Sequence, residues 1–189
     1  MQFVQTRVTG CIRVEIEPHS DERGLFARIF SEEEFAEAGL PVHFVQWSMS
    51  RNLNRGTTRG LHFQRPPSAE GKLVRCVRGS IFDVALDIRP ESPSYLRHVA
   101  VRLDADGVMA LYIPPGCAHG FQTLEDGSDV LYAMSDVYRP DLAEGLRWND
   151  PRFGIDWPLD DVVMNARDAA YPDIDENRLA SFDWREVGG

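Results

Sequence analysis

The sequence has few cysteines and no long apolar run, and these two absences bear on the cellular compartment and on membrane association. Cys11, Cys76 and Cys117 are the three cysteines of the 189 residues, an odd and widely spaced set. Such a set does not form a disulfide scaffold, so we expect free thiols in a reducing compartment, the cytoplasm. No apolar run approaches the roughly 18 residues that a membrane helix needs. Residues 1–7 lack the basic and apolar regions of a secretory signal, so we expect no membrane partner.

Basic residues are outnumbered by acidic ones. Lys and Arg total 20 and Asp and Glu total 30, which gives a formal net charge of −10. Nucleic-acid binding needs a basic face, so we expect no nucleic-acid partner. The sequence has neither a Gly-x-Gly-x-x-Gly run nor a P-loop, and it gives no sign of a redox cofactor. Hydrophobic residues make up 43%, enough for a core, and the length predicts one domain over residues 1–189.

Hydrophobic residues alternate with polar ones along several short segments, the pattern of half-buried β-strands. The clearest alternations cover residues 12–16, 82–88 and 99–103. Turn sequences separate such segments, at residues 21–24, 78–80, 104–107, 114–116 and 125–128. Many short strands at this spacing predict an all-β fold, an antiparallel jelly-roll barrel.

Helices are expected only at the margins of this barrel. Ser31 followed by Glu34 is a capping-box pattern and predicts a short helix. A second short helix is expected over residues 175–184. The strand pattern fades after about residue 158, so we expect a C-terminal tail that packs on the barrel.

The densest group of polar residues on a predicted strand is Arg59, His62 and Gln64, with Lys72 soon after. Side chains two residues apart on a strand share a face, so an inward His62 implies an inward Gln64. Polar groups inside a small barrel must be paired or must face a ligand. An isolated histidine is more often a hydrogen-bonded core residue, but this crowding favours a site.

A second group surrounds His119, where Pro-x-Gly-x-x-His resembles the second motif of the cupins. In metal-binding cupins this histidine is a ligand, and the first motif supplies His-x-His and a glutamate. Here the first motif reads His62-x-Gln64, and the reach of Glu70 is uncertain. A metal needs three or four converging donors, so we expect none. The neighbouring Cys117 is expected to be a buried filler rather than a reactive thiol.

Tyr132 and Tyr138 form a third group, an even number of residues apart and so of one strand parity. The sequence is equally consistent with two tyrosines of the hydrophobic core and with two tyrosines of a functional site. A histidine, a lysine and a tyrosine inside a barrel nevertheless suit proton transfer beside a carbonyl group. A neutral histidine removes a carbon-bound proton, a cation stabilises the enolate oxygen, and a tyrosine returns a proton to the opposite face.

At these residues the chain resembles the dTDP-4-dehydrorhamnose 3,5-epimerase family, from about Ile16 to Pro172. The matching stretches are residues 21–24, 44–46, 59–64, 71–74, 83–89, 113–114, 118–121, 148–151 and 155–158. The resemblance implies a cupin-type jelly roll that works as a homodimer without metal or other cofactor. It implies inversion at C3 and C5 of a nucleotide-linked 4-keto-6-deoxyhexose, with dTDP as the expected nucleotide, in deoxysugar and cell-surface polysaccharide biosynthesis.

The resemblance also implies roles for individual residues. His62 matches the general base, Asp168 the carboxylate paired with it, Tyr132 the acid, and Lys72 the group that stabilises the enolate. The residues that match substrate-binding positions are Arg23, Gln46, Arg59, His119, Glu144 and Arg167, with Tyr138 as the stacking platform for the nucleotide base.

The sequence departs from the family pattern at four of its positions. Arg28 stands where the family has a glutamate, Ser48 where it has an asparagine, and Ala133 and Arg167 where it often has lysines. We count Arg28 and Ser48 as substrate-binding positions and expect them to change the nucleotide or sugar preference. An acidic protein that binds a diphosphate needs a locally basic mouth. The candidates for it are Arg23, Arg28, Arg59, Lys72 and Arg167, whereas Arg51, Arg55 and Arg65 are expected to be solvated.

Three other interpretations remain open. The same base would serve an epimerase that acts at C3 or C5 alone, or a 3,4-ketoisomerase. A metal-dependent cupin, such as a dioxygenase or sugar isomerase, would contain stoichiometric metal. A non-catalytic jelly roll would bind the keto sugar without exchanging its protons.

Overall fold

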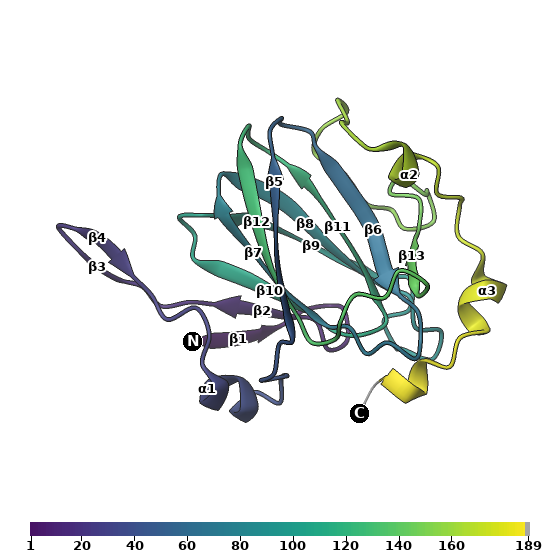
Figure 1. Ribbon diagram of the computed structural model, residues 1–189, viewed down its shortest axis with the longest axis horizontal. Coiled ribbons are helices and arrows are strands. Elements are labelled where there is room, and N and C mark those ends of the chain that lie inside the picture. Colours follow the sequence, from purple (N-terminus) through teal and green to yellow (C-terminus); the bar gives the residue numbers. More distant parts are fainter. Residues whose placement is uncertain (188–189) are drawn as a thin grey trace.

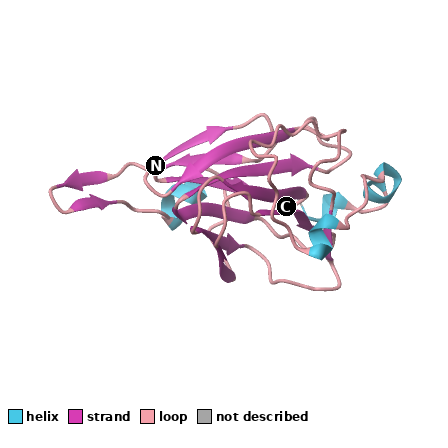
Figure 2. Cartoon of the chain, turned by 90° about the horizontal axis from the view of Figure 1, so that it is seen from above, coloured by secondary structure: helices cyan, strands magenta, loops and turns pink. Residues whose placement is uncertain are grey.

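The computed structural model of the protein describes residues 1–187, and two antiparallel sheets form its body (Figures 1 and 2). The first sheet has six strands, in the order β1 (Gln2–Gln5), β2 (Ile12–Glu15), β10 (Met109–Ile113), β7 (Lys72–Arg78), β12 (Ser128–Met134) and β5 (Gln46–Asn52). The second has five, in the order β13 (Ala143–Gly145), β6 (Thr58–Gln64), β11 (Cys117–Thr123), β8 (Ser80–Asp87) and β9 (His98–Asp104). Most neighbours are distant in sequence, as in a jelly roll, and the predicted all-β fold is confirmed.

The alternation over residues 82–88 predicts a half-buried strand, and for β8 this prediction is wrong. Every residue of β8 except Phe82 is buried, including Asp83 and Asp87. Val84 and Leu86 belong to an apolar cluster with the C-terminal tail, on the outside of the five-stranded sheet. The side chains of opposite parity, Asp83 among them, therefore face the barrel interior. Because the tail covers this part of the outer face, β8 is buried on both sides.

The helix predicted at residue 31 is α1 (Glu32–Glu37), which lies beside the first sheet (Figure 1). The Ser31 hydroxyl accepts the N–H of Glu34 at 3.5 Å, as a capping residue does. The Glu34 carboxylate accepts instead from the Met1 ammonium at 2.6 Å. Only half of the predicted capping box is therefore formed.

Three short helical segments follow the last strand and run along the β6–β13 side of the molecule (Figure 1). They are α2 (Ala166–Ala169), which the sequence did not signal, α3 (Glu176–Ala180) and the 3₁₀ turn η1 (Trp184–Val187). The helix expected over residues 175–184 thus ends at Ala180. Leu179 and Trp184 are buried against the sheet residues Leu61 and Phe63. Within residues 1–187, no helix is long and apolar enough to cross a membrane.

A hairpin of β3 (His19–Asp21) and β4 (Gly24–Phe26) projects away from both sheets (Figures 1 and 2). Its turn lies at residues 21–24, as the sequence predicts. Two of its apolar side chains, Leu25 and Phe26, are exposed. The hairpin thus adds two apolar side chains to the exposed surface.

Candidate active site

The first pair of functional side chains joins strand β6 to helix α2. Nε2 of His62 lies 2.9 Å from Oδ1 of Asp168, and Oδ2 of Asp168 accepts the N–H of Gly60 at 3.2 Å. Asp168 is buried, whereas the His62 ring is 41% exposed. Burial opposes ionisation of Asp168, but the hydrogen bonds from His62 and Gly60 outweigh it and hold the pKa of Asp168 below its ordinary value. The carboxylate can therefore orient the imidazole and stabilise its charged form.

Local backbone geometry explains how Asp168 reaches its place. Asn165 caps α2, and its Oδ1 accepts the N–H of Asp168 at 2.7 Å. On β6, Gly60 has a φ of +126°, and a Cβ there would lie 2.5 Å from Cα of Gly120 on β11. Glycine at both positions lets the two strands approach where their register shifts, and leaves the Gly60 N–H free to bind the carboxylate.

A second His–Asp pair lies on the strands beside the first. His119 is the direct cross-strand partner of His62, and its Nε2 lies 2.7 Å from Oδ1 of Asp83. Both side chains are buried. The Tyr132 ring, on β12 of the opposite sheet, lies 5.9 Å from the His119 ring, nearly perpendicular to it. Burial raises the pKa of Tyr132 well above its ordinary value, so the phenol stays protonated.

A cavity of about 250 Å³ opens beside His62. Four other residues expected at the site line it, namely Lys72, Tyr138, Glu144 and Arg167. It also contains Glu70, whose Oε2 lies 2.5 Å from Nζ of Lys72, both side chains being largely buried. Glu70 thus holds Lys72 at the cavity wall, a role that the sequence did not assign to it.

Glu144 is held in the cavity wall by two arginines. Its Oε1 lies 2.9 Å from Nη2 of Arg178, on α3, and 3.4 Å from Nε of Arg65. No sequence pattern indicates a role for Arg178, and the expectation that Arg65 is a solvated loop charge is wrong. Arg65 also donates to the Asp141 carbonyl oxygen at 3.1 Å. Only the fold brings Arg178 of the tail close to Arg65, in the loop that follows β6.

Other expected residues form a chain of contacts at the edge of the site. Oε1 of Gln46 accepts the N–H of Tyr138 at 3.1 Å, and Nε2 of Gln46 lies 3.5 Å from the Ser48 hydroxyl. Ser48 is the cross-strand partner of Tyr132. Nε of Arg59 donates to Asn52 at 2.9 Å. These contacts place Gln46 beside Tyr138 and Ser48 opposite Tyr132, whereas Arg59 is bonded at the far end of β5.

The structure corrects one sequence inference, about Tyr138, and shows that Gln64 is paired. Tyr138 does not share the strand face of Tyr132, because β12 ends at Met134 and Tyr138 lies exposed in the following loop. Gln64 is buried and bonded to its neighbours: its Nε2 donates to Val137 at 3.1 Å and its Oε1 accepts from Arg139 at 2.6 Å. Gln64 is thus paired, as a buried polar residue requires, and it also lines the cavity beside His62.

Arg23 and Arg28 lie away from the cavity within this chain. Arg23 is in the projecting hairpin, where it pairs with Asp21 at 2.5 Å, and Arg28 follows the hairpin and pairs with Glu34 at 3.2 Å. Figure 1 shows the hairpin on the opposite side of the barrel from β6, β13 and α2. Within this one chain, neither arginine reaches the cavity where the sequence predicts substrate contact.

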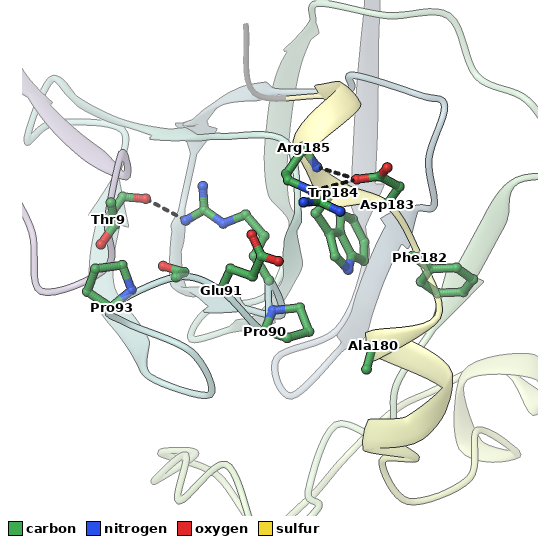
Figure 3. A pocket seen from close by; sticks show the side chains of 11 residues that line it. Thr9, Pro90, Glu91, Pro93, Ala180, Phe182, Asp183, Trp184 and Arg185 are labelled. Atoms are coloured by element: carbon green, nitrogen blue, oxygen red, sulfur yellow. Dashed lines mark hydrogen bonds and ion pairs between the residues drawn. The ribbon is translucent and has the colours of Figure 1, made fainter.

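A separate cavity of about 310 Å³ lies between the loop after β8 and the η1 turn (Figure 3). It contains none of the expected site residues. Its two arginines have partners, since Arg89 pairs with Asp87 and Arg185 with Asp183. This cavity consequently offers a ligand no free charge from either arginine.

The histidine and carboxylate side chains pair off rather than converge. His62 has Asp168 and His119 has Asp83, and residues 1–187 contain no group of three His, Cys, Asp or Glu side chains arranged to hold a metal ion. Cys117 is buried, and burial raises the pKa of its thiol, which agrees with its expected role as a filler.

The fold and these contacts define a jelly-roll enzyme with a cavity-lining histidine paired to a buried aspartate and with a protonated tyrosine, suited to moving protons at carbon. The family model for dTDP-4-dehydrorhamnose 3,5-epimerase matches residues 5–176. The dTDP-4-dehydrorhamnose 3,5-epimerase of Methanothermobacter thermautotrophicus is 44% identical over 179 residues, 93% of this chain and 96% of that protein.

Solved structures agree with the family model. NovW, a 4-keto-6-deoxy sugar epimerase from Streptomyces spheroides, gives a TM-score of 0.90 at 34% identity and covers 95% of this chain and 90% of its own. A dTDP-6-deoxy-D-glucose-3,5-epimerase from Legionella pneumophila in complex with dTDP-4-keto-L-rhamnose gives 0.86 at 34% identity, over 98% and 96% of the two chains. The protein belongs to the dTDP-4-dehydrorhamnose 3,5-epimerase family, it is an epimerase, and its barrel is of the cupin type.

Proposed function

We propose that the protein inverts C3 and C5 of a dTDP-linked 4-keto-6-deoxyhexose, without a cofactor, and so produces dTDP-4-dehydrorhamnose for rhamnose biosynthesis. The single observation that carries the proposal is the His62–Asp168 pair, which holds a base beside a cavity that Lys72 also lines. Two relatives support the substrate: one is a dTDP-4-dehydrorhamnose 3,5-epimerase, and the other was solved with dTDP-4-keto-L-rhamnose.

In the proposed reaction, His62 removes the proton from the carbon next to the ketone. The C–H electron pair forms the enolate double bond, and the ketone oxygen takes the negative charge. Lys72 stabilises that oxygen, and Asp168 stabilises the imidazolium. Tyr132 then gives its proton to the opposite face of the carbon, which inverts the centre, and regains a proton from solvent. The His62 imidazolium releases its proton to solvent, so both groups are restored. The same steps at the second carbon complete the double inversion.

The nucleotide is expected to bind at the open end of the cavity. Tyr138 is about half exposed there and offers a flat ring to a base, and Arg167 follows on α2. Contact with Tyr138 and the neighbouring Tyr171 raises the pKa of Arg167, so its guanidinium stays charged for a phosphate. A local cation of this kind is needed in a chain of net charge −10.

We further infer that the enzyme works as a homodimer in the cytoplasm. The outer face of the six-stranded sheet exposes Trp47 and Met49, at 52% and 59%. A second copy would cover this apolar face, and its hairpin would bring Arg23 and Arg28 to the cavity. The three unpaired cysteines fit a reducing compartment.

Solvent exchange tests the proposed function directly. The protein is incubated in D₂O with dTDP-4-dehydro-6-deoxyglucose, and proton NMR follows the signals at C3 and C5. We expect deuterium at both carbons, an inverted product, and loss of both in His62→Asn with the fold retained. Exchange at one carbon alone would limit the function to a single-site epimerase, and a 3,4-keto shift would make it a ketoisomerase. Full activity in His62→Asn would reject His62 as the base.

A further inference from the structure

Asp83 is a fully buried carboxylate with one hydrogen-bond partner among the described side chains, His119. Its Oδ1 lies 2.7 Å from Nε2 of His119, and its Oδ2 has no partner within the described residues. An incompletely paired carboxylate in a protein interior lowers stability. The steps proposed above use His62, Asp168, Lys72 and Tyr132, and leave Asp83 without a task.

The position of His119 suggests a role for Asp83. His119 lies directly across from His62 on the neighbouring strand, and its ring contacts the ring of Tyr132. It therefore lies between the proposed base and the proposed acid. Its Nε2 is taken by Asp83, and its Nδ1 makes no hydrogen bond among the described residues. Nδ1 is thus the ring nitrogen that remains for a substrate.

The identity of the partner determines what Nδ1 can do. A neutral imidazole has one N–H and one lone pair, and an ionised carboxylate only accepts hydrogen bonds. Asp83 therefore favours the tautomer with its hydrogen on Nε2, which leaves the lone pair on Nδ1. A 4-keto-6-deoxyhexose of the proposed substrate class carries hydroxyl groups on its ring, and each of them can donate to that lone pair.

We propose that Asp83 is a positioning residue that acts through His119: by accepting the Nε2–H, it makes Nδ1 the acceptor for a sugar hydroxyl and so fixes the ring between His62 and Tyr132. The proposal rests on the proposed epimerase function. A site built to bond a hydroxyl discriminates by orders of magnitude when that bond is lost. A sugar turned by a small angle no longer presents its C–H bond to the base.

Two matched variants test this role. Asp83→Asn keeps the shape of the side chain, but its amide group can donate to Nε2 and favour the opposite tautomer. In Ser-His-Asp enzymes the same change at the aspartate leaves the wrong tautomer. The control is Asp87→Asn, because Asp87 is the other buried aspartate of β8 and is bonded to Arg89, Ser92 and Ser94, away from His119.

Nitrogen-15 NMR of the histidine rings in the ligand-free protein reports the tautomer, and NMR of the sugar in D₂O reports kcat/KM. We expect the His119 hydrogen on Nε2 in the wild type and on Nδ1 in Asp83→Asn. The kcat/KM of Asp83→Asn should fall by about 10²-fold or more. Asp87→Asn should lower thermal stability and leave both the tautomer and kcat/KM as in the wild type.

A wild-type His119 with its hydrogen on Nδ1 would overturn the proposal, and this measurement stands even where Asp83→Asn does not fold. An Asp83→Asn protein with the wild-type tautomer and wild-type kcat/KM would overturn it too. Absence of any exchange by the wild type would instead reject the epimerase function, while the ring spectra would still decide what Asp83 does to His119.

Discussion

His62 and Asp168 lie 2.9 Å apart, from Nε2 to Oδ1, although 106 residues separate them in the sequence. Two features of the backbone hold the carboxylate in place: the N–H of Gly60 on β6 and the Asn165 cap of α2. The strand that carries the proposed base thus also supplies a hydrogen bond to the carboxylate that orients it. Any change in the β6–α2 contact should therefore act on the chemistry as well as on stability.

The first prediction concerns the charge of this carboxylate. Asp168→Asn keeps the volume of the side chain but removes the charge that stabilises an imidazolium and selects its tautomer. We expect kcat to fall by roughly 10³- to 10⁴-fold, as for the equivalent change in a Ser-His-Asp triad, with little change in KM. Steady-state kinetics check this, and circular dichroism controls for the fold. A kcat within a few-fold of the wild type would contradict the role.

The second prediction concerns stability in acid. The folded pKa of Asp168 lies below its ordinary value, so the unfolded chain takes up this proton first as the pH falls. The stabilisation by ionised Asp168 is therefore complete well above the unfolded pKa of about 3.9 and is lost as the pH falls through the lower folded pKa. Urea unfolding should show wild type and Asp168→Asn differing most at neutral pH and converging below about pH 4. A difference that does not depend on pH would contradict this assignment.

The third prediction concerns the close approach of β6 and β11. Gly60→Ala would place a Cβ 2.5 Å from Cα of Gly120, at a φ of +126°. We expect a loss of at least about 1–3 kcal/mol in the free energy of unfolding, because the backbone must move. Gly39→Ala is the matched control: Gly39 also has a positive φ, of +69°, but nothing lies within 4 Å of its Cβ position. Chemical denaturation of both variants measures the difference, and equal losses would show that φ alone matters.

The strands, the turns and the first helix follow from local patterns, and these were predictable. The alternation over residues 82–88 was misleading because a strand pattern shows which residues share a face but not what covers each face. On β8 the apolar series lies under the tail, and Asp83 faces the barrel interior. Only the fold shows that both faces are covered.

The same limit applies to the site. His62, Lys72 and Asp83 stand in stretches that match the family pattern. Tyr132, Glu70 and Arg178 lie outside every such stretch. Charged residues on strands, loops and short helices are usually solvated. Nothing local in the sequence therefore shows that Asp83, Glu70 and Arg178 are paired in the folded protein. The contacts of Asp83 and Arg178 arise because the fold brings β8 beside β11 and the tail beside β13. Glu70 instead pairs with Lys72, two residues further along the same segment. Asp168 itself was assigned through resemblance, since no local pattern links residues so far apart.

The fourth prediction concerns the proposed exchange of hairpins between two chains. If Arg23 of one chain serves the cavity of its partner, a variant in Arg23 and a variant in His62 damage different halves of each site. Arg23→Ala and His62→Asn homodimers should both be nearly inactive. After unfolding and joint refolding in equal amounts, the mixed dimers should have one intact site each and restore about a quarter of the wild-type activity. The matched control mixes His62→Asn with Lys72→Ala, whose lesions fall in the same site and should not complement. Activity that stays at the level of the two inactive parents would show that the hairpin does not complete the partner's cavity.

The proposed dimer contact can be tested separately at Trp47, on the exposed face of the six-stranded sheet. Trp47→Glu places a charge on this apolar face, so the dimer fraction measured by analytical ultracentrifugation should fall.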